Sequence, residues 1–227
     1  MKGRSKIGVT VDVVIFTIDQ GSLKILLVKR TEDPFKGLWS LPGGFVFDNE
    51  SVDDAALRLL KEKVQISNIY LEQLYTFGEP RRDPRFRVIT VSYYAVVNAS
   101  KLADSLVGLG GQARLFEVRP VPKQLAFDHG EIVRYALERL MHKVNYTTIC
   151  FQLLEKEFTL SELQRAYEII MGEKLDKRNF RKKMVQLAIL KDLKKMRTVG
   201  PKRPARIYSF AETGVVKLQE KGIVVPF

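Results

Sequence analysis

The chain has 227 residues, of which 45% are hydrophobic, and carries a formal net charge of +12. This apolar fraction excludes global disorder, because it is ample for a folded core. The single cysteine excludes an internal disulfide and fits a reducing, cytoplasmic compartment. An apolar run near the start is interrupted by Asp12, and no stretch approaches the roughly 18 uninterrupted apolar residues of a membrane helix, so no membrane partner is expected.

The first 145 residues alternate strand-like and helix-like segments. Residues 9–18 and 23–30 are rich in β-forming residues and are joined by a turn-prone link. Residues 39–47 lead to a helix that Ser51 can cap, with Asp54 completing a capping box. The remaining expected elements are strands at 71–78, 88–98 and 115–121 and a helix at 131–143. This order predicts an α/β fold.

Residues 44–66 resemble the Nudix box, G-x5-E-x7-R-E-U-x-E-E-x-G-U, where U is apolar. Three places depart from it: Leu59 and Lys63 stand where the motif has glutamates, and Gln65 where it has glycine. The resemblance implies a Nudix α/β/α sandwich over residues 7 to 143, and the sequences LLVKR and WSLPGGF upstream of the box support it. The places that match are Gly44, Glu50, Arg58, Leu60, Glu62 and Ile66.

The two substituted glutamate positions bear directly on catalysis. Residues 59, 62 and 63 share one helix face, where a hydrolase of this type needs carboxylates to hold Mg²⁺. Leucine offers no ligand, and lysine places a positive charge there. We therefore expect no catalytic residues, no metal site and no cofactor. The alternative is an active Nudix hydrolase, similar to ADP-ribose pyrophosphatases, with Mg²⁺ at Glu50 and Glu62 and a rescuing carboxylate such as Glu79 or Asp83.

A second resemblance concerns the ligand. Residues 76–95 are similar to the corresponding segment of Nudix ADP-ribose pyrophosphatases and their regulatory relatives, and they hold four arginines, which suit phosphates or form a solvated or DNA-facing patch. Phe77 and Phe86 either stack on a base or lie in the core. His129 follows Asp128, a candidate cap for the next helix, and the N-terminus of a helix can bind an anion. A lone histidine, however, is more often a structural residue than a ligand contact. The residues expected to contact an ADP-ribose-like effector are Arg30, Gly43, Gly44, Glu50, Lys63, Arg82, Arg85, Arg87 and His129.

Charge divides the chain unevenly. Residues 1–145 carry 21 Lys/Arg against 17 Asp/Glu, a net +4, whereas residues 146–227 carry 17 against 9, a net +8. Residues 177 to 206 hold 12 basic side chains and one acid, Asp192. We therefore expect an effector domain over 1–145 and a domain over 146–227 that faces a polyanion.

The second domain begins with a capped helix. Thr159 and Glu162 form a capping box for a helix that ends at Gly172, and Asp176 can cap a second helix over 177–190. A turn at 200–205 then predicts a basic β-hairpin. Helix, helix and basic hairpin resemble a winged helix-turn-helix, although a basic helix can also be a solvated face. The residues expected to contact DNA are Lys177, Arg178, Asn179, Arg181 and Lys182 on the helix and Lys202, Arg203 and Arg206 on the hairpin.

Together, a Nudix domain with an altered box and this second domain are similar to the Nudix-related transcriptional regulators of NAD metabolism, the NrtR type. The resemblance covers nearly the whole chain. It implies a homodimeric repressor that binds a double-stranded DNA operator and is released by an ADP-ribose-like effector. Regulators of the same architecture that sense sugars such as arabinose supply the alternative effector.

Overall fold

The computed structural model describes residues 6–198 and 204–211. The chain separates into two compact units, the first ending at Arg139 and the second beginning at Leu140, whereas the sequence-based boundary falls between residues 145 and 146. Each unit is described by itself. Within the described residues, none of the helices combines the length and the apolar character needed to cross a membrane.

A seven-stranded mixed sheet forms the centre of the first unit. Its main path runs β3-β2-β1-β6-β5, while β4 pairs with β1 and β7 pairs with β2. Strands β1 and β6 are parallel, and the other pairs are antiparallel. The bounds are β1 Gly8–Asp19, β2 Ser22–Lys29, β3 Trp39–Ser40, β4 Gly43–Phe45, β5 Tyr70–Phe77, β6 Val88–Val96 and β7 Ala113–Glu117.

The β1–β2 hairpin turns as its sequence predicts. Gln20 and Gly21 both have positive φ, 50° and 80°, which is the backbone that a two-residue hairpin turn requires. Glycine adopts this conformation without strain because it has no Cβ.

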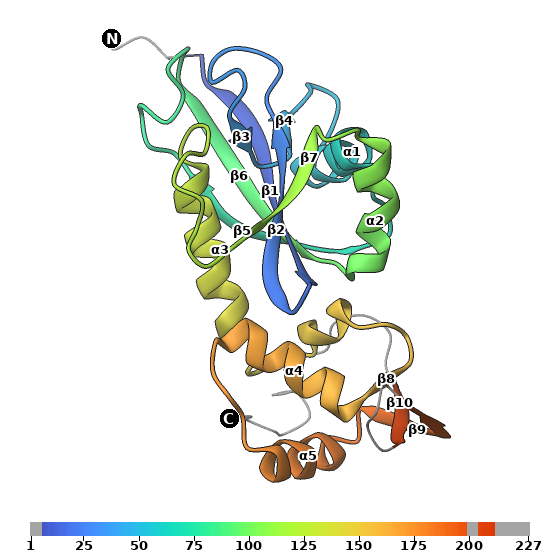
Figure 1. Ribbon diagram of the computed structural model, residues 1–227. Coiled ribbons are helices and arrows are strands. Elements are labelled where there is room, and N and C mark those ends of the chain that lie inside the picture. The colour runs from blue at the N-terminus through green and yellow to red at the C-terminus, as the bar shows by residue number, and fades with distance from the viewer. Residues whose placement is uncertain (1–5, 199–203, 212–227) are drawn as a thin grey trace. The chain divides into compact units, whose positions relative to one another are not determined.

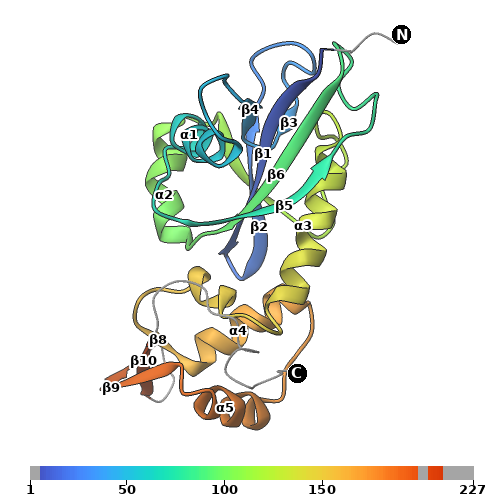
Figure 2. The same cartoon turned by 180° about the vertical axis from the view of Figure 1, so that it is seen from behind.

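Helices cover both faces of this sheet. Helices α1 (Val52–Val64) and α2 (Ala99–Gly108) lie on one side, and α3 (His129–Lys143) begins on the other (Figures 1 and 2). The predicted capping box of α1 is confirmed, since Ser51 and Asp54 exchange side chain–backbone hydrogen bonds. Helix α2 was not predicted from the sequence. Its cap is Asn98, whose side chain accepts a hydrogen bond from the backbone N–H of Ser100.

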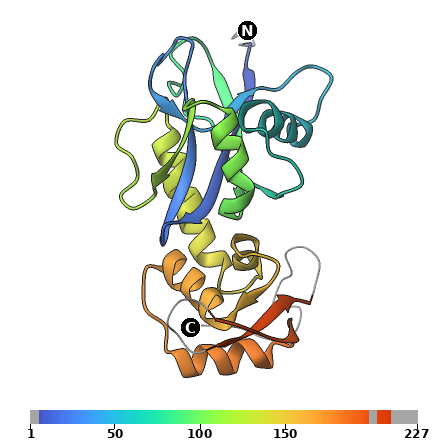
Figure 3. The same cartoon turned by 45° about the vertical axis from the view of Figure 1, so that its right-hand side comes forward.

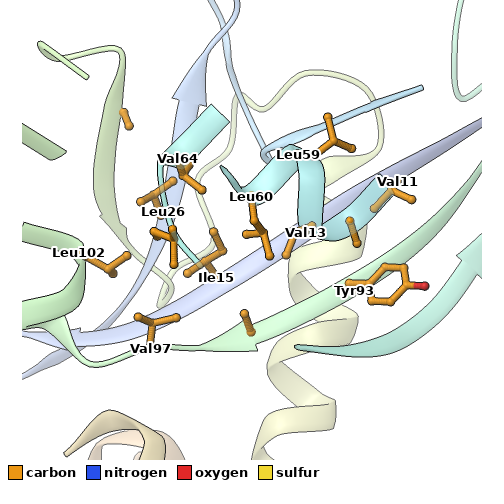
Figure 4. Packing of buried hydrophobic residues seen from close by; sticks show 14 of the residues in the cluster. Val11, Val13, Ile15, Leu26, Leu59, Leu60, Val64, Tyr93, Val97 and Leu102 are labelled. Atoms are coloured by element: carbon orange, nitrogen blue, oxygen red, sulfur yellow. The ribbon is translucent and has the colours of Figure 1, made fainter. Parts of the chain in front are cut away.

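The core between β1 and α1 follows two periodicities. Val11, Val13 and Ile15 alternate along β1 and are fully buried. Figure 4 shows Leu60 of α1 turned toward Val13 and Ile15, with Leu59 at the end of the cluster near Val11. The apolar stripe of α1 therefore packs on one face of the sheet.

Among its described residues, the second unit has three helical segments after α3 and a three-stranded sheet of order β8-β10-β9. Figure 3 shows α5 and the β9–β10 hairpin in this unit. The capping box of Thr159 and Glu162 is confirmed, as is the left-handed Gly172 that ends α4. The bounds are a 3₁₀ helix Ile149–Leu153, β8 Phe158–Thr159, α4 Leu160–Met171, α5 Lys177–Gln186, β9 Leu190–Arg197 and β10 Ala205–Phe210.

The prediction for the second helix of this unit was too long. Helix α5 ends at Gln186 rather than at residue 190, because Ala188 has a positive φ of 52° and β9 begins at Leu190. The apolar stripe of α5 is as expected, with Phe180, Met184 and Leu187 buried.

Candidate functional site

The retained polar residues of the Nudix box bind one another. Arg58 donates two hydrogen bonds to Glu50, from Nε at 2.8 Å and from Nη2 at 2.6 Å, and a third to Glu62 at 3.2 Å. It also donates to the carbonyl oxygen of Phe45 and lies 3.9 Å from the centroid of the Phe47 ring. The bonds from Arg58, with one from the Phe47 N–H, lower the pKa of Glu50 to about 2. This clamp fixes the loop before α1 to the helix.

Leu59 occupies the first substituted glutamate position as part of the core. Its side chain is 2% exposed, and a Cβ added at Gly44 would lie 2.8 Å from its Cδ2 atom. Leu59 therefore packs directly on the backbone of Gly44. Lys63, at the second position, has an exposed side chain. Among the described residues, no group of three His, Cys, Asp or Glu side chains is arranged to hold a metal ion.

A buried charged network lies between β1 and the start of α3. Arg82 donates to both carboxylate oxygens of Asp128, at 2.8 and 2.7 Å, and to Asp12 at 3.3 Å. Nδ1 of His129 accepts from the backbone N–H of Leu41 at 2.9 Å, and its Nε2 lies 3.4 Å from Asp12. Burial opposes the charge on Asp12, but His129 and Arg82 outweigh it and lower the pKa of Asp12 from 3.8 to about 2.

This network changes how two expected ligand contacts are interpreted. Arg82 is 7% exposed and His129 is 3% exposed, and the partners of both are residues of the same domain. The carboxylate of Asp128 accepts two hydrogen bonds from Arg82. Gly43 supports the same site, because an added Cβ would lie 2.3 Å from Oδ1 of Asp12. The geometry favours a structural role for all of them.

Two other expected contacts, Arg30 and Arg85, are each held by hydrogen bonds within the same domain. Arg30 donates to the carbonyl oxygens of Pro34 and Glu32, and Arg85 donates from Nε and Nη2 to the buried carboxylate of Asp83. Burial and the charge of Arg85 lower the pKa of Arg30. Within the described residues, no hydrogen bond reaches Nη1 of either guanidinium. Guanidinium groups with spare donors suit a phosphate group.

Aromatic rings border this arginine pair. Arg30 lies 4.8 Å from the ring centroid of Phe127, and Arg85 lies 5.5 Å from that of Phe45. Phe127 also lines a cavity of about 410 Å³ at the start of α3, together with the charged residues Lys123, Asp128, Glu131 and Arg134. Of the two phenylalanines considered for base stacking, Phe77 is buried against Tyr135, whereas Phe86 is 47% exposed.

Arg87, another expected contact, lies close to Gly78. Its guanidinium is close to Gly78, with Nη2 3.8 Å from where a Cβ of that glycine would be. Its Nη1 is buried and has no hydrogen-bond partner among the described residues. A buried donor without a partner is rare, so Arg87 remains a candidate contact for an acceptor group.

The expected DNA-contacting residues of α5 are all exposed. All five lie outside the buried stripe of the helix: Lys177, Arg178, Asn179, Arg181 and Lys182. Val185, which the sequence-based reasoning did not single out, is 61% exposed. Because residues three and four apart are neighbours, Val185 shares the outward face of Arg178, Arg181 and Lys182.

The hairpin that follows α5 in the chain is held by ion pairs. Arg206, an expected DNA contact, binds Asp192 on the neighbouring strand at 2.9 Å and keeps 60% of its side chain exposed. Arg197 of β9 donates to Glu162, the residue that completes the capping box of α4. Lys202 and Arg203 lie outside the described residues. The hairpin and the start of α4 are thus joined by charge-assisted bonds.

Comparisons with known proteins cover both units. Residues 6–136 match the NUDIX domain, and residues 150–210 match the NrtR DNA-binding winged helix domain. The chain is 38% identical over 204 residues to the ADPR responsive transcriptional repressor NtrR of Acinetobacter baylyi. The aligned residues cover 89% of this chain and 81% of that protein.

Two solved structures of Shewanella oneidensis NrtR are also similar. The structure complexed with a 27mer DNA has a TM-score of 0.82 and 36% identity, covering 89% of this chain and 93% of that one. The NUDIX domain complexed with ADP ribose has a TM-score of 0.51 and 35% identity, covering 61% of this chain and 90% of that one. The chain therefore belongs to the NrtR-type regulators of the Nudix family, in which a Nudix domain is followed by a DNA-binding winged helix domain.

Proposed function

We propose that this protein is a transcriptional repressor that binds operator DNA through its second unit and ADP-ribose through its Nudix domain. The observation that carries the proposal is the similarity over 89% of the chain to an ADPR responsive repressor, which extends through both domains. Related structures hold DNA and ADP ribose. The paired arginines and the basic outward face of α5 are the features of this chain that suit the two ligands.

The diphosphate of ADP-ribose binds between Arg30 and Arg85 in this proposal. Both guanidiniums are fixed by bonds to their own domain and keep Nη1 available, so little side-chain ordering is needed on binding. Lys63 and Arg87 are further candidate contacts. Five other expected residues act indirectly, by holding the loops that carry the contacts: Arg82, His129, Glu50, Gly43 and Gly44.

We also propose that the Nudix domain is catalytically inactive. Leu59 is buried where a hydrolase needs a metal ligand, and Glu50 is neutralised by Arg58. The alternative, an ADP-ribose hydrolase, draws on the retained Glu50, Arg58 and Glu62. Incubation of pure protein with Mg²⁺ and ADP-ribose distinguishes the two: we expect no turnover, and robust hydrolysis would establish the alternative.

Calorimetry tests the effector. ADP-ribose is expected to bind once per chain without added metal. The variant Arg85→Gln should bind it about tenfold or more weakly, because a charge-assisted bond to phosphate is lost. Arg81→Gln is the matched control, since Arg81 is an exposed arginine of the same loop. Binding of a simple sugar in place of ADP-ribose would assign the protein to the sugar-sensing group.

Gel-shift titration tests DNA binding and release. We propose that a homodimer places two copies of α5 in successive major grooves of a palindromic site. On DNA from the gene's own upstream region, Arg178→Ala and Arg181→Ala should each cost roughly 1–3 kcal/mol. Lys101→Ala removes an exposed charge from the first unit and should leave affinity unchanged. Saturating ADP-ribose should weaken DNA binding, and unchanged affinity would contradict the sensor model.

A further inference from the structure

The outward face of α5 carries an apolar side chain among its cations. Val185 is 61% exposed and lies near the end of this helix, which runs from Lys177 to Gln186. A single exposed valine is ordinary on a protein surface. Val185, however, lies on the face that carries the expected DNA contacts, so what it could contact there follows from its position.

Packing against α4 determines which face of α5 points outward. Phe180 of α5 and Tyr167 of α4 are both 1% exposed and meet edge to face, with ring centroids 5.5 Å apart. Met184 continues the same stripe and is fully buried. Arg181 adds a hydrogen bond between the two helices, from its Nη2 to Oγ of Ser161 at 3.2 Å. The side of α5 opposite the stripe is therefore held facing away from α4.

Val185 completes a spacing that suits the major groove of DNA. The spacing i, i+3, i+4 and i+7 is formed by four exposed residues: Arg178, Arg181, Lys182 and Val185. Side chains at this spacing form a continuous row along two turns of one helix face. The recognition helix of homeodomains reads base edges with a row of the same spacing. Val185 therefore lies where a helix in the groove meets a base.

The folding of α5 gives no reason for a valine at this position. Most of the Val185 side chain is exposed, and a β-branched residue favours a helix less than alanine or lysine does. Valine also has no donor or acceptor for a phosphate or for the polar edge of a base. It offers a methyl surface, and the complementary group in the major groove is the C5 methyl of thymine.

We propose that Val185 is a specificity-determining residue, which selects thymine in the operator by contact with the C5 methyl group of that base. The assignment rests on the DNA-binding function proposed above and adds one base to it. A cytosine at the same place would put an amino group, and no methyl, against the valine. That donor would lose water without gaining an acceptor, so cytosine is disfavoured.

A second copy of this chain is the competing occupant of the face. It would bring the same cations, Arg178, Arg181 and Lys182, toward their counterparts, and like charges that meet in an interface are unfavourable. Residues 177 to 206 hold 12 basic side chains and one acid, so the surroundings of Val185 are complementary to a polyanion. Charge therefore favours DNA.

The test removes each methyl partner in turn. The operator is selected from random-sequence DNA with the full-length protein, and its thymines are replaced one at a time by deoxyuridine, which lacks only the C5 methyl. For wild type, the change at one position of each half-site should weaken binding about fourfold, the effect of one buried methyl group. Val185→Ala should weaken binding to the thymine operator similarly and should not respond to deoxyuridine there. Val185→Ile keeps an apolar surface and should retain the response.

Two controls separate this contact from general effects. Val107→Ala makes the same change at an 82% exposed valine of the first unit and should leave DNA affinity unchanged. Arg178→Ala should weaken binding but keep the response to deoxyuridine. In addition, Val185→Ala should leave the salt dependence of binding unchanged, because no phosphate contact is lost. Val185→Gln also removes the apolar surface, and it replaces the alanine variant if that variant does not fold.

The outcomes separate the base contact from the function. If Val185→Ala binds the operator as tightly as wild type, or responds to deoxyuridine at the same positions, the assignment is overturned while DNA binding stands. If that variant binds DNA normally and becomes monomeric in light scattering, the face is a contact between copies. If wild type selects no operator, the proposed function fails and the assignment with it.

Discussion

Arg82 is the residue whose removal should destabilise the first unit most clearly. Its side chain is 3% exposed and makes three charge-assisted hydrogen bonds, two to Asp128 and one to Asp12. Arg82→Met keeps much of the volume but leaves two largely buried carboxylates without their cation. Breaking a buried pair in this way costs about 3–5 kcal/mol, a large part of the 5–15 kcal/mol that stabilises a typical domain.

Urea denaturation followed by tryptophan fluorescence measures this loss. The chain has one tryptophan, Trp39, whose carbonyl oxygen accepts from the N–H of Ala126 close to the network. Arg81→Met, at the exposed neighbouring arginine, should change stability by less than about 0.5 kcal/mol. Adding Asp128→Asn to Arg82→Met should restore part of the loss. A loss below about 1 kcal/mol for Arg82→Met would refute a stabilising role for the network.

Three further changes test other contacts in the same denaturation assay. The pKa of Asp12 is lowered from 3.8 to about 2, which corresponds to roughly 2 kcal/mol of stabilisation of the folded state. This stabilisation is present above pH 4 and is lost as the pH falls to 2. Wild type should therefore lose this stability in that window, whereas the pH dependence of Asp12→Asn should lack this contribution. Gly43→Ala should lower the free energy of unfolding by about 1–3 kcal/mol, because the added Cβ meets Asp12 and the Val11 carbonyl oxygen. Gly78→Ala is the control, since a Cβ there makes only ordinary contacts. Equal losses in the two variants would contradict the packing argument. Thr159→Ala removes the cap of α4 and should cost about 0.5–2 kcal/mol, measured by far-UV circular dichroism, and no loss would mean that the cap contributes nothing.

Features that depend on local spacing were predictable from the sequence. The two capping boxes, the β1–β2 turn and the apolar stripe of α5 each involve residues within a few positions of one another. The motif resemblance supplied the family, and both family matches confirm it. The α2 helix was missed because Asn98 ends a strongly β-forming run, and its capping role is visible only once the strand stops at Val96.

Partners distant in the sequence could not be identified in the same way. Asp12 was noticed only as an interruption of an apolar run, yet it pairs with Arg82, 70 residues away. A signal did exist, because a charge in the middle of a buried strand must have a counter-charge. The position of the Phe86 ring depends on its contacts with Gly8 and Phe45, which are distant from it in the sequence. No local pattern distinguishes such a ring from a core residue such as Phe77.

The clamp between Glu50 and Arg58 shows that some residues of the motif hold the loop and helix together, independently of the positions that bind metal in a hydrolase. Its bonds join the loop and helix through side chains that need no ion, while the positions of Leu59 and Lys63 lie outside those bonds. A search that demands every glutamate of the box would discard this chain. A search keyed on Gly44, Glu50 and Arg58 would retain it, and would also find other domains that keep the clamp without every glutamate of the box.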